Sequence, residues 1–424
     1  MDAFKLHRSL ISQYGQYSQS FLKIQDARIR AEVESEIKQG IYWPEPMVQL
    51  NPSYSTGKSI DELCTEGVLH KDCKRIFRVG KSEGSIGTPL QLYLHQTQAI
   101  GHAQGNRPYV LTTGTGSGKS LAYIVPIVDR VLKTGSGGGI KAIIVYPMNA
   151  LANSQLEELD KFLGRGIHEK LVTYARYTGQ ESEDEKRRIL EDPPDILLTN
   201  YVMLELILTR VDEKRLVRNA KELQFLVLDE FHTYRGRQGA DVAMLIRRCR
   251  EAFSGDDLLC VGTSATMASE EGMSLEDQQQ VVAKVATKLF GASVEPSQVV
   301  GETLERITPS INFEDPNTHE GLRQSAQWVL AQETCVDRQV LRNQPLASWI
   351  ESSLGLEVDR ASDRLVRAKP KPIAGEKSSA VTLASLAGIS LEDAQRAIRR
   401  CLELGVEGDE VPLFAFRLHQ FISR

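Results

Sequence analysis

The sequence has 424 residues, of which 41% are hydrophobic and 25% are charged, as in ordinary globular proteins. These proportions exclude a largely disordered chain, and because no apolar run approaches the roughly 20 residues of a membrane span, we expect a cytoplasmic protein without a membrane partner. The formal net charge of −5 excludes an overall basic field, so binding of nucleic acid would need a local basic surface.

Residues 1–88 form a predicted N-terminal accessory region. Apolar residues recur with helical periodicity from Phe4 to Lys38, and a turn-rich stretch follows around Pro44 and Pro52. We therefore expect helices followed by turns, and no motif in this region indicates a function.

Residues 89–310 contain the pattern of an α/β fold. Short β-rich runs alternate with longer helical segments, which predicts a parallel sheet with helices on both faces. Because each run is followed by a turn or a helix start, we expect consecutive β–α units. The predicted strands are the runs PYVLTT, KAIIVYP, LVTYARY, DILLTN, QFLVLDE and LLCVGTSAT.

The C-terminal part is predicted to add a second helical accessory region. Residues 311–378 comprise a helical segment from His319 to Ser353 and a connector rich in Lys, Arg and Pro, which we expect to lack a core. Residues 379–424 contain two short amphipathic helices, the second beginning with a capping pattern in Ser390 and Asp393. This pair resembles the helix-turn-helix of a winged-helix module, and a pair used only for packing is an equally open interpretation.

The segment YVLTTGTGSGKSLAYIVPIV has the pattern of a phosphate-binding loop between a strand and a helix. Its glycines allow backbone N–H groups to face phosphate oxygens, and the N-terminal end of the next helix favours negative charge. The segment departs from the pattern GxxxxGK[ST], because Thr113 stands where the first glycine is expected, and a plain glycine-rich turn is the alternative. The predicted nucleotide-binding residues are Thr115, Gly116, Ser117, Gly118, Lys119 and Ser120, with the Ser120 hydroxyl as a Mg²⁺ ligand.

Two acidic residues, Asp229 and Glu230, follow the apolar run QFLVL. Ligands of open α/β sheets bind at the carboxyl ends of the strands, where this pair is expected to lie. Asp229 is predicted to hold Mg²⁺ and Glu230 to polarise the attacking water, which with Lys119 and Ser120 completes a site for phosphoryl transfer from ATP. A solvated acidic turn is the alternative.

Several motifs together resemble those of superfamily 2 DEAD/DEAH-type helicases. The segments TGTGSGKS, DEFH and Ser264-Ala265-Thr266 resemble motifs I, II and III of that family, in that order. LHQTQAI, YPMNALANSQ, YTGQ and LLTNYVML resemble its adenine-reading and nucleic-acid-gripping segments. The resemblance covers residues 90–270, implies a complete first RecA-like lobe with a P-loop, and extends to large bacterial DNA helicases of repair and anti-phage defence.

The resemblance implies roles that the residue pattern alone does not give. Gln96 would read adenine, and His232 would act beside the catalytic residues Lys119, Asp229 and Glu230. The residues expected to couple loss of the γ-phosphate to lobe closure are Ser264, Ala265 and Thr266. The residues expected to touch a sugar-phosphate backbone are Asn149, Thr178, Gly179 and Thr199.

The resemblance also implies an activity and its partners. The activity is that of an ATP-dependent DNA helicase or translocase, and the partners are ATP, Mg²⁺, nucleic acid with DNA favoured over RNA, a second RecA-like lobe of the same polypeptide, and a defence-system protein. No motif IV, V or VI is recognised before Arg424, so we expect these 424 residues alone to bind nucleotide weakly and hydrolyse little. The alternatives are an RNA helicase, a non-catalytic nucleic-acid-binding regulatory module, and a P-loop kinase.

Overall fold

The structure is a computed structural model in which the chain forms two compact units. One unit, called the sheet unit, is Tyr54–Thr303, and the other, called the helical unit, combines Met1–Ser53 with Leu304–Arg424. The chain therefore enters the sheet unit at Tyr54 and leaves it after Thr303. The described residues are 3–21, 24–38, 44–82, 85–114, 116–164, 171–253, 257–265, 273–359, 363–407 and 412–421.

The sheet unit is built on a seven-stranded sheet in which every neighbouring pair of strands is parallel. This confirms the predicted α/β class, and the sequence predicted every strand except β13, which forms one edge. In spatial order the strands are β13 (Val299–Gly301), β7 (Tyr109–Thr112), β12 (Leu259–Ser264), β11 (Phe225–Leu228), β8 (Ala142–Tyr146), β10 (Ile196–Asn200) and β9 (Tyr174–Arg176).

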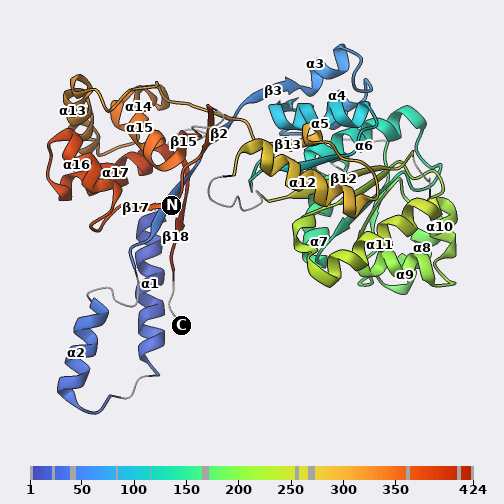
Figure 1. The fold of residues 1–424 in the computed structure, drawn as a ribbon, viewed down its shortest axis with the longest axis horizontal. Helices are drawn as coiled ribbons and strands as arrows, with labels where there is room; N and C mark the ends of the chain where they lie inside the picture. Colours follow the sequence, from blue (N-terminus) through green and yellow to red (C-terminus); the bar gives the residue numbers. More distant parts are fainter. Residues whose placement is uncertain are drawn as a thin grey trace. The chain divides into compact units, whose positions relative to one another are not determined.

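Helices cover both faces of this sheet (Figure 1). Successive residues of a strand point to opposite faces, so Ile144 and Val227 pack with helices α5, α6 and α7, whereas Ile143 and Leu226 pack with α9, α11 and α12. All residues of β8 and β11 are buried, which explains why their sequences are continuous apolar runs.

The bounds of the helices in the sheet unit agree with a β–α alternation. They are α3 (Ile60–Thr65), α4 (Cys73–Ile76), α5 (Leu94–Gln104), α6 (Leu121–Thr134), α7 (Asn149–Leu159), α8 (Glu183–Glu191), α9 (Tyr201–Thr209), α10 (Lys214–Asn219), α11 (Gly236–Phe253) and α12 (Leu275–Phe290). Two short strand pairs lie outside the main sheet: β3 (Thr56–Ser59) with β6 (Gln91–Tyr93), and β4 (Arg78–Val79) with β5 (Thr88–Pro89). None of the helices in the described part of the chain combines the length and apolarity needed to cross a bilayer.

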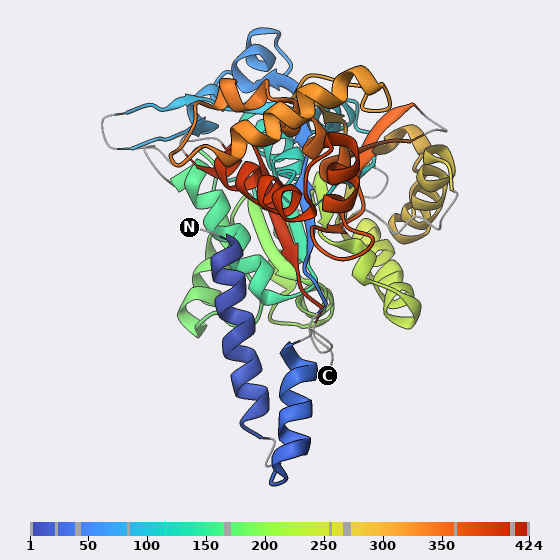
Figure 2. The same cartoon turned by 90° about the vertical axis from the view of Figure 1, so that its left-hand side faces the viewer.

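The helical unit has its own core, in which Leu322, Trp349, Ile398 and Phe414 are buried. Its helices are α1 (Ala3–Gln19), α2 (Ala27–Lys38), α13 (His319–Leu330), α14 (Arg338–Arg342), α15 (Pro345–Ile350), α16 (Ser379–Ala387) and α17 (Leu391–Val406). Within this unit, α1 and α2 extend away from the helices α13 to α17 (Figure 2). The predicted cap of α17 is confirmed, because the Ser390 hydroxyl accepts a hydrogen bond of 3.0 Å from Asp393 N.

Residues 54–88 lie in the sheet unit, although the sequence predicted a separate accessory region of residues 1–88. Strand β3 pairs with β6, and Ile60 and Ile76 are buried in the same cluster as the residues of α6. The reason is that α3 and α4 are too short to bury their apolar residues alone. The units of the structure thus divide the chain at other positions than the predicted segments 89–310, 311–378 and 379–424.

The basic connector predicted before residue 378 has regular structure. Strands β15 (Leu356–Asp359) and β16 (Arg364–Arg367) form an antiparallel pair, and β17 (Lys371–Pro372) pairs with β1 (Met47–Asn51), which also pairs with β18 (Ala415–His419). Ala368 and Ile373 are buried. The prediction of a connector without a core was therefore wrong. In the sequence, the charged side chains at exposed strand positions outnumber the two buried residues, so the segment resembles a solvent-exposed connector.

Candidate nucleotide and nucleic-acid site

The predicted phosphate loop lies between β7 and α6, as expected. Gly116 and Gly118 have φ values of 86° and 67°, which other residues rarely adopt. The hydroxyls of Thr113 and Ser117 are buried and lie 2.6 Å apart, so the threonine that replaces the expected glycine joins the two sides of the loop. Thr115, which the sequence predicted to bind nucleotide, falls outside the described residues.

Helix α5 supports the loop through His95 and Gln96. The Gln96 amide donates from Nε2 to Gly118 O at 2.8 Å and accepts at Oε1 from Tyr93 N at 2.8 Å. A Cβ atom on Gly118 would lie 2.6 Å from Gln96 Nε2, which is a second reason for glycine there. The structure therefore places Gln96, predicted to read adenine, directly against the phosphate loop.

His95 was not singled out by its sequence. Its ring is fully buried, and its Nε2 lies 2.9 Å from Ser117 O. Burial lowers the pKa of His95, so the ring is neutral at physiological pH and Nε2–H donates to the carbonyl. His95 therefore fixes the loop without placing a positive charge beneath it.

The acidic pair follows β11, at the carboxyl end of the strand. The Thr263 hydroxyl of β12 donates to Asp229 Oδ1 at 2.5 Å and accepts from Glu230 N at 3.0 Å. Glu230 has a φ of 49°, a left-handed conformation that turns the chain sharply after the strand. Burial raises the pKa of Asp229 to about 6. Sequence reasoning missed Thr263, although it directly precedes the predicted Ser264-Ala265-Thr266 segment.

Lys119 brings the loop and the acidic pair together. Its Nζ lies 3.1 Å from Glu230 Oε1 and 3.3 Å from Ser264 O, and His232 Nδ1 lies 3.2 Å from Glu230 Oε2. Three segments distant in the sequence thus meet within a few ångströms. The Ser264 hydroxyl donates a hydrogen bond of 2.7 Å to Ala265 O. Thr266 falls outside the described residues.

The donor set fits a hard divalent cation such as Mg²⁺. Ser120 is the N-cap residue of α6 and directly follows Lys119 in the chain, and Asp229 supplies a buried carboxylate. Mg²⁺ prefers carboxylate and other oxygen ligands and keeps several waters and phosphate oxygens in its shell. Burial disfavours the charged form of Asp229, and a divalent cation beside the carboxylate would favour it.

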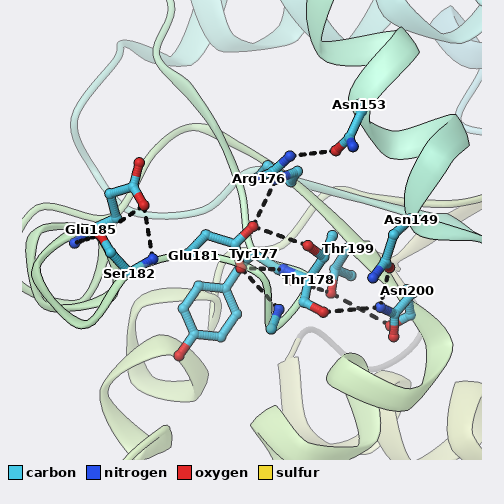
Figure 3. Close-up of polar contacts among 11 residues, drawn as sticks. Asn149, Asn153, Arg176, Tyr177, Thr178, Glu181, Ser182, Glu185, Thr199 and Asn200 are labelled. Carbon is cyan, nitrogen blue, oxygen red and sulfur yellow. Dashed lines mark hydrogen bonds and ion pairs between the residues drawn. The ribbon is translucent and has the colours of Figure 1, made fainter.

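The residues predicted to touch a nucleic-acid backbone cluster at the carboxyl ends of β9 and β10 (Figure 3). Asn200 Nδ2 donates to Asn149 Oδ1 at 2.7 Å and to Thr178 O at 3.2 Å. The Thr199 hydroxyl is buried and donates to Tyr177 O at 2.6 Å. The structure therefore brings together Asn149, Thr178, Gly179 and Thr199. Thr199 lies on the buried side of this cluster and stabilises it through its bond to Tyr177 O.

Glu181, which sequence reasoning missed, closes the turn at Thr178 and Gly179. Its carboxylate accepts from the backbone N–H groups of both residues, at 2.8 Å each, and from Arg176 Nε at 2.7 Å (Figure 3). Arg176 also donates to Asn153 of α7. The backbone donors of this turn are consequently occupied by a carboxylate, as they would be by a phosphate.

Comparisons with known proteins found similar helicases. The chain is 24% identical to the Druantia protein DruE of Escherichia coli over 379 residues, covering 62% of this chain and 20% of DruE. It is 33% identical to the uncharacterized ATP-dependent helicase YprA of Bacillus subtilis over 182 residues, covering 42% of this chain and 23% of YprA. The chain thus spans less than a quarter of the length of these relatives.

A crystal structure of the DUF1998 helicase MrfA bound to DNA is similar to 70% of this chain and 40% of that chain, with 22% identity and a TM-score of 0.45. The model of the DEAD/DEAH box helicase family matches residues 93–274. This range contains the phosphate loop, the acidic pair and the cluster around Thr178 described above. Residues 93–274 of this chain are therefore similar to the DEAD/DEAH box helicase domain.

Proposed function

We propose that this chain is the nucleotide-binding part of an ATP-dependent helicase or translocase that moves on DNA. The observation that carries the proposal is the 3.1 Å contact between Lys119 of the phosphate loop and Glu230 of the acidic pair. A lysine and a carboxylate at this separation can face the same triphosphate. The match to a helicase family over residues 93–274 supports the choice of reaction.

Each residue of the site receives a role in this proposal. Lys119 binds the β- and γ-phosphates of ATP, and the N–H groups of Gly116 to Ser120 surround them. Ser120 and Asp229 hold Mg²⁺, which stabilises the charge of the phosphates. Glu230 leaves Lys119 to polarise the attacking water, and His232, 3.2 Å from Glu230, orients that carboxylate.

Coupling residues connect this chemistry to movement. Ser264 O lies 3.3 Å from Lys119 Nζ, so a change at the γ-phosphate reaches the segment of Ser264, Ala265 and Thr266. Gln96 contacts the loop at Gly118, and in this proposal its amide leaves Gly118 O and Tyr93 N to recognise the adenine edge. A second RecA-like lobe would close over the site and a defence-system protein would be its partner, as the sequence resemblance implies.

The nucleic-acid surface is proposed to be the cluster around Asn149, Thr178, Gly179 and Thr199. Gly179 is exposed, and Arg176 lies near it in an ion pair with Glu181, with 2.7 Å between Arg176 Nε and Glu181 Oε1. DNA is preferred to RNA in this proposal because the motifs resemble those of bacterial DNA helicases. Competition between DNA and RNA of matched sequence for the 424-residue chain tests this preference; equal competition by RNA would contradict it.

Nucleotide binding and hydrolysis test the proposal directly. Wild-type chain should bind Mg²⁺–ADP saturably, Lys119→Ala should lose that binding, and Glu230→Gln should bind ATP but not hydrolyse it. Lys186→Ala, on the exposed helix α8, is the matched control and should behave as wild type. Unchanged nucleotide affinity in Lys119→Ala, or unchanged hydrolysis in Glu230→Gln, would contradict the proposal.

A further inference from the structure

Glu302, which directly follows the edge strand β13, reaches the phosphate loop. Its Oε2 accepts a hydrogen bond of 3.0 Å from Gly114 N, 188 residues earlier in the chain. Gly114 is buried where the backbone leaves β7 and enters the loop. A carboxylate that accepts a backbone N–H forms a charge-assisted hydrogen bond, which is stronger than a neutral one.

Glu302 also lies at the exit of the chain from the sheet unit, because the next residue, Thr303, is the last of that unit. Thr303 O accepts from Ser55 N at 2.9 Å, and Ser55 lies next to Tyr54, the first residue of the unit. The entry and the exit of the chain are therefore hydrogen-bonded to one another inside the sheet unit.

The same bonds continue back to the phosphate loop through α5. Ser55 O accepts from Leu94 N at 2.8 Å, at the start of this helix. Two residues later, Gln96 Nε2 donates to Gly118 O at 2.8 Å. These hydrogen bonds and the covalent segments between them form a closed ring, which we call the loop ring. Its members, in order around the ring, are Gly114, Glu302, Thr303, Ser55, Leu94, Gln96 and Gly118.

We propose that Glu302 is a positioning residue that holds the phosphate loop in the conformation that binds nucleotide. Through Glu302, binding of nucleotide to the loop also affects the two places where the chain enters and leaves the sheet unit. The inference rests on the proposed nucleotide binding by this loop. Phosphates that fix Gly116 to Lys119 also fix Gly114, so the bond to Glu302 opens less often. Thr303 and Ser55 then become more rigid, although neither touches the nucleotide.

Two substitutions separate the hydrogen bond of Glu302 from its charge. Glu302→Ala removes the acceptor and should weaken Mg²⁺–ADP binding by about tenfold or more, because a hydrogen bond to a charged group is worth roughly 1.5–3 kcal/mol. Glu302→Gln keeps an acceptor oxygen for Gly114 N and should remain within about threefold of wild type. Glu305→Ala, three residues later and exposed, is the control. Thermal unfolding of each variant without nucleotide checks that the fold persists.

Amide hydrogen exchange measures the transmission. In wild-type chain, saturating Mg²⁺–ADP should slow exchange of the Ser55 and Leu94 amides by at least about fivefold, since their bonds open with the ring. In Glu302→Ala, saturated at a higher ADP concentration, the slowing at Ser55 should be lost. Glu302→Gln should retain it.

The failures of the two proposals are distinguishable. If wild-type chain did not bind Mg²⁺–ADP, or if Lys119→Ala bound it equally well, the proposed nucleotide function itself would be refuted. If wild type bound but Glu302→Ala had the same affinity and the same slowing at Ser55, the role of Glu302 would be refuted while the nucleotide function stood. Equal weakening by Glu302→Gln and Glu302→Ala would refute the acceptor role.

Discussion

A single hydroxyl, that of Thr263, joins the two carboxylates of the acidic pair. It donates to Asp229 Oδ1 and accepts from Glu230 N, so it fixes both the direction of one carboxylate and the turn that presents the other. Thr263 is fully buried, so bulk water does not reach these two hydrogen bonds in the folded protein. The position of these carboxylates therefore depends on a residue that itself makes no contact with substrate.

Replacing Thr263 by the isosteric valine should slow ATP hydrolysis while leaving nucleotide binding close to normal. Loss of one hydrogen bond to a charged group, roughly 1.5–3 kcal/mol, corresponds to about a 10- to 100-fold lower rate if it is lost in the transition state. Single-turnover hydrolysis and ADP affinity measure the two effects separately. Thr263→Ser, which keeps the hydroxyl, is the control, and an unchanged rate in Thr263→Val would contradict the assignment.

The buried ring of His95 predicts a dependence of stability on pH. Burial lowers its pKa from the ordinary 6.5, so below pH 6.5 the unfolded chain binds a proton that the folded chain does not. The free energy of unfolding should therefore fall as the pH decreases from 6.5 toward the lowered pKa of the folded state. Denaturant unfolding of wild type and His95→Gln between pH 7.5 and 5 tests this. That range of ~2.5 pH units begins above the ordinary pKa of histidine and extends into the region where stability should fall.

The His95→Gln variant should lose less stability on acidification than wild type. Equal slopes in wild type and His95→Gln would show that another group titrates.

At the scale of elements, the start of helix α9 ties the nucleic-acid cluster together. Asn200 Oδ1 accepts from Met203 N at 2.8 Å as an N-cap, while its Nδ2 donates to Asn149 and Thr178. One side chain thus ends β10, begins α9 and holds two residues of the proposed backbone contact. The position of the proposed contact residues depends on how this helix begins.

Asn200→Ala should lower the free energy of unfolding of the sheet unit by about 1–2 kcal/mol, the usual cost of losing an N-cap. Asn149→Ala removes only one acceptor and should cost less. Circular dichroism during denaturant unfolding measures both. A cost for Asn149→Ala as large as that for Asn200→Ala would show that the cap contributes little.

At the scale of the whole molecule, the two units have separate cores and different spectroscopic probes. The chain has 3 tryptophans; Trp328 and Trp349 belong to the helical unit, and the third, at position 43, falls outside the described residues. The phosphate loop and the acidic pair belong to the sheet unit. Tryptophan fluorescence therefore follows one unit, whereas nucleotide would bind to the other.

Saturating Mg²⁺–ADP should raise the unfolding temperature of the sheet unit alone. A ligand at 100 times its Kd stabilises the folded state by about 2.7 kcal/mol, which should move the circular dichroism transition but not the tryptophan fluorescence transition. Lys119→Ala should abolish the shift. An equal shift of both transitions would show that the units unfold together.

The sequence by itself determined the elements whose signal is local. Buried parallel strands are continuous apolar runs, so β7, β8, β10, β11 and β12 could be recognised without contacts. The glycines, lysine and serine of the phosphate loop and the acidic pair after β11 are adjacent in the chain, so their spacing is visible in the sequence. For the same reason the capping pattern of α17 was predicted and confirmed.

Only the tertiary structure decided which distant residues complete these motifs. Glu302 meets Gly114 from 188 residues away because β13 lies beside β7, and Thr263 meets Asp229 from 34 residues away because β12 lies beside β11. The short strand β13 and the charged strand β16 carry too few apolar residues for a periodic signal. Their formation depends on neighbours already in place, and hydrogen bonds between residues far apart in the chain leave no spacing to recognise.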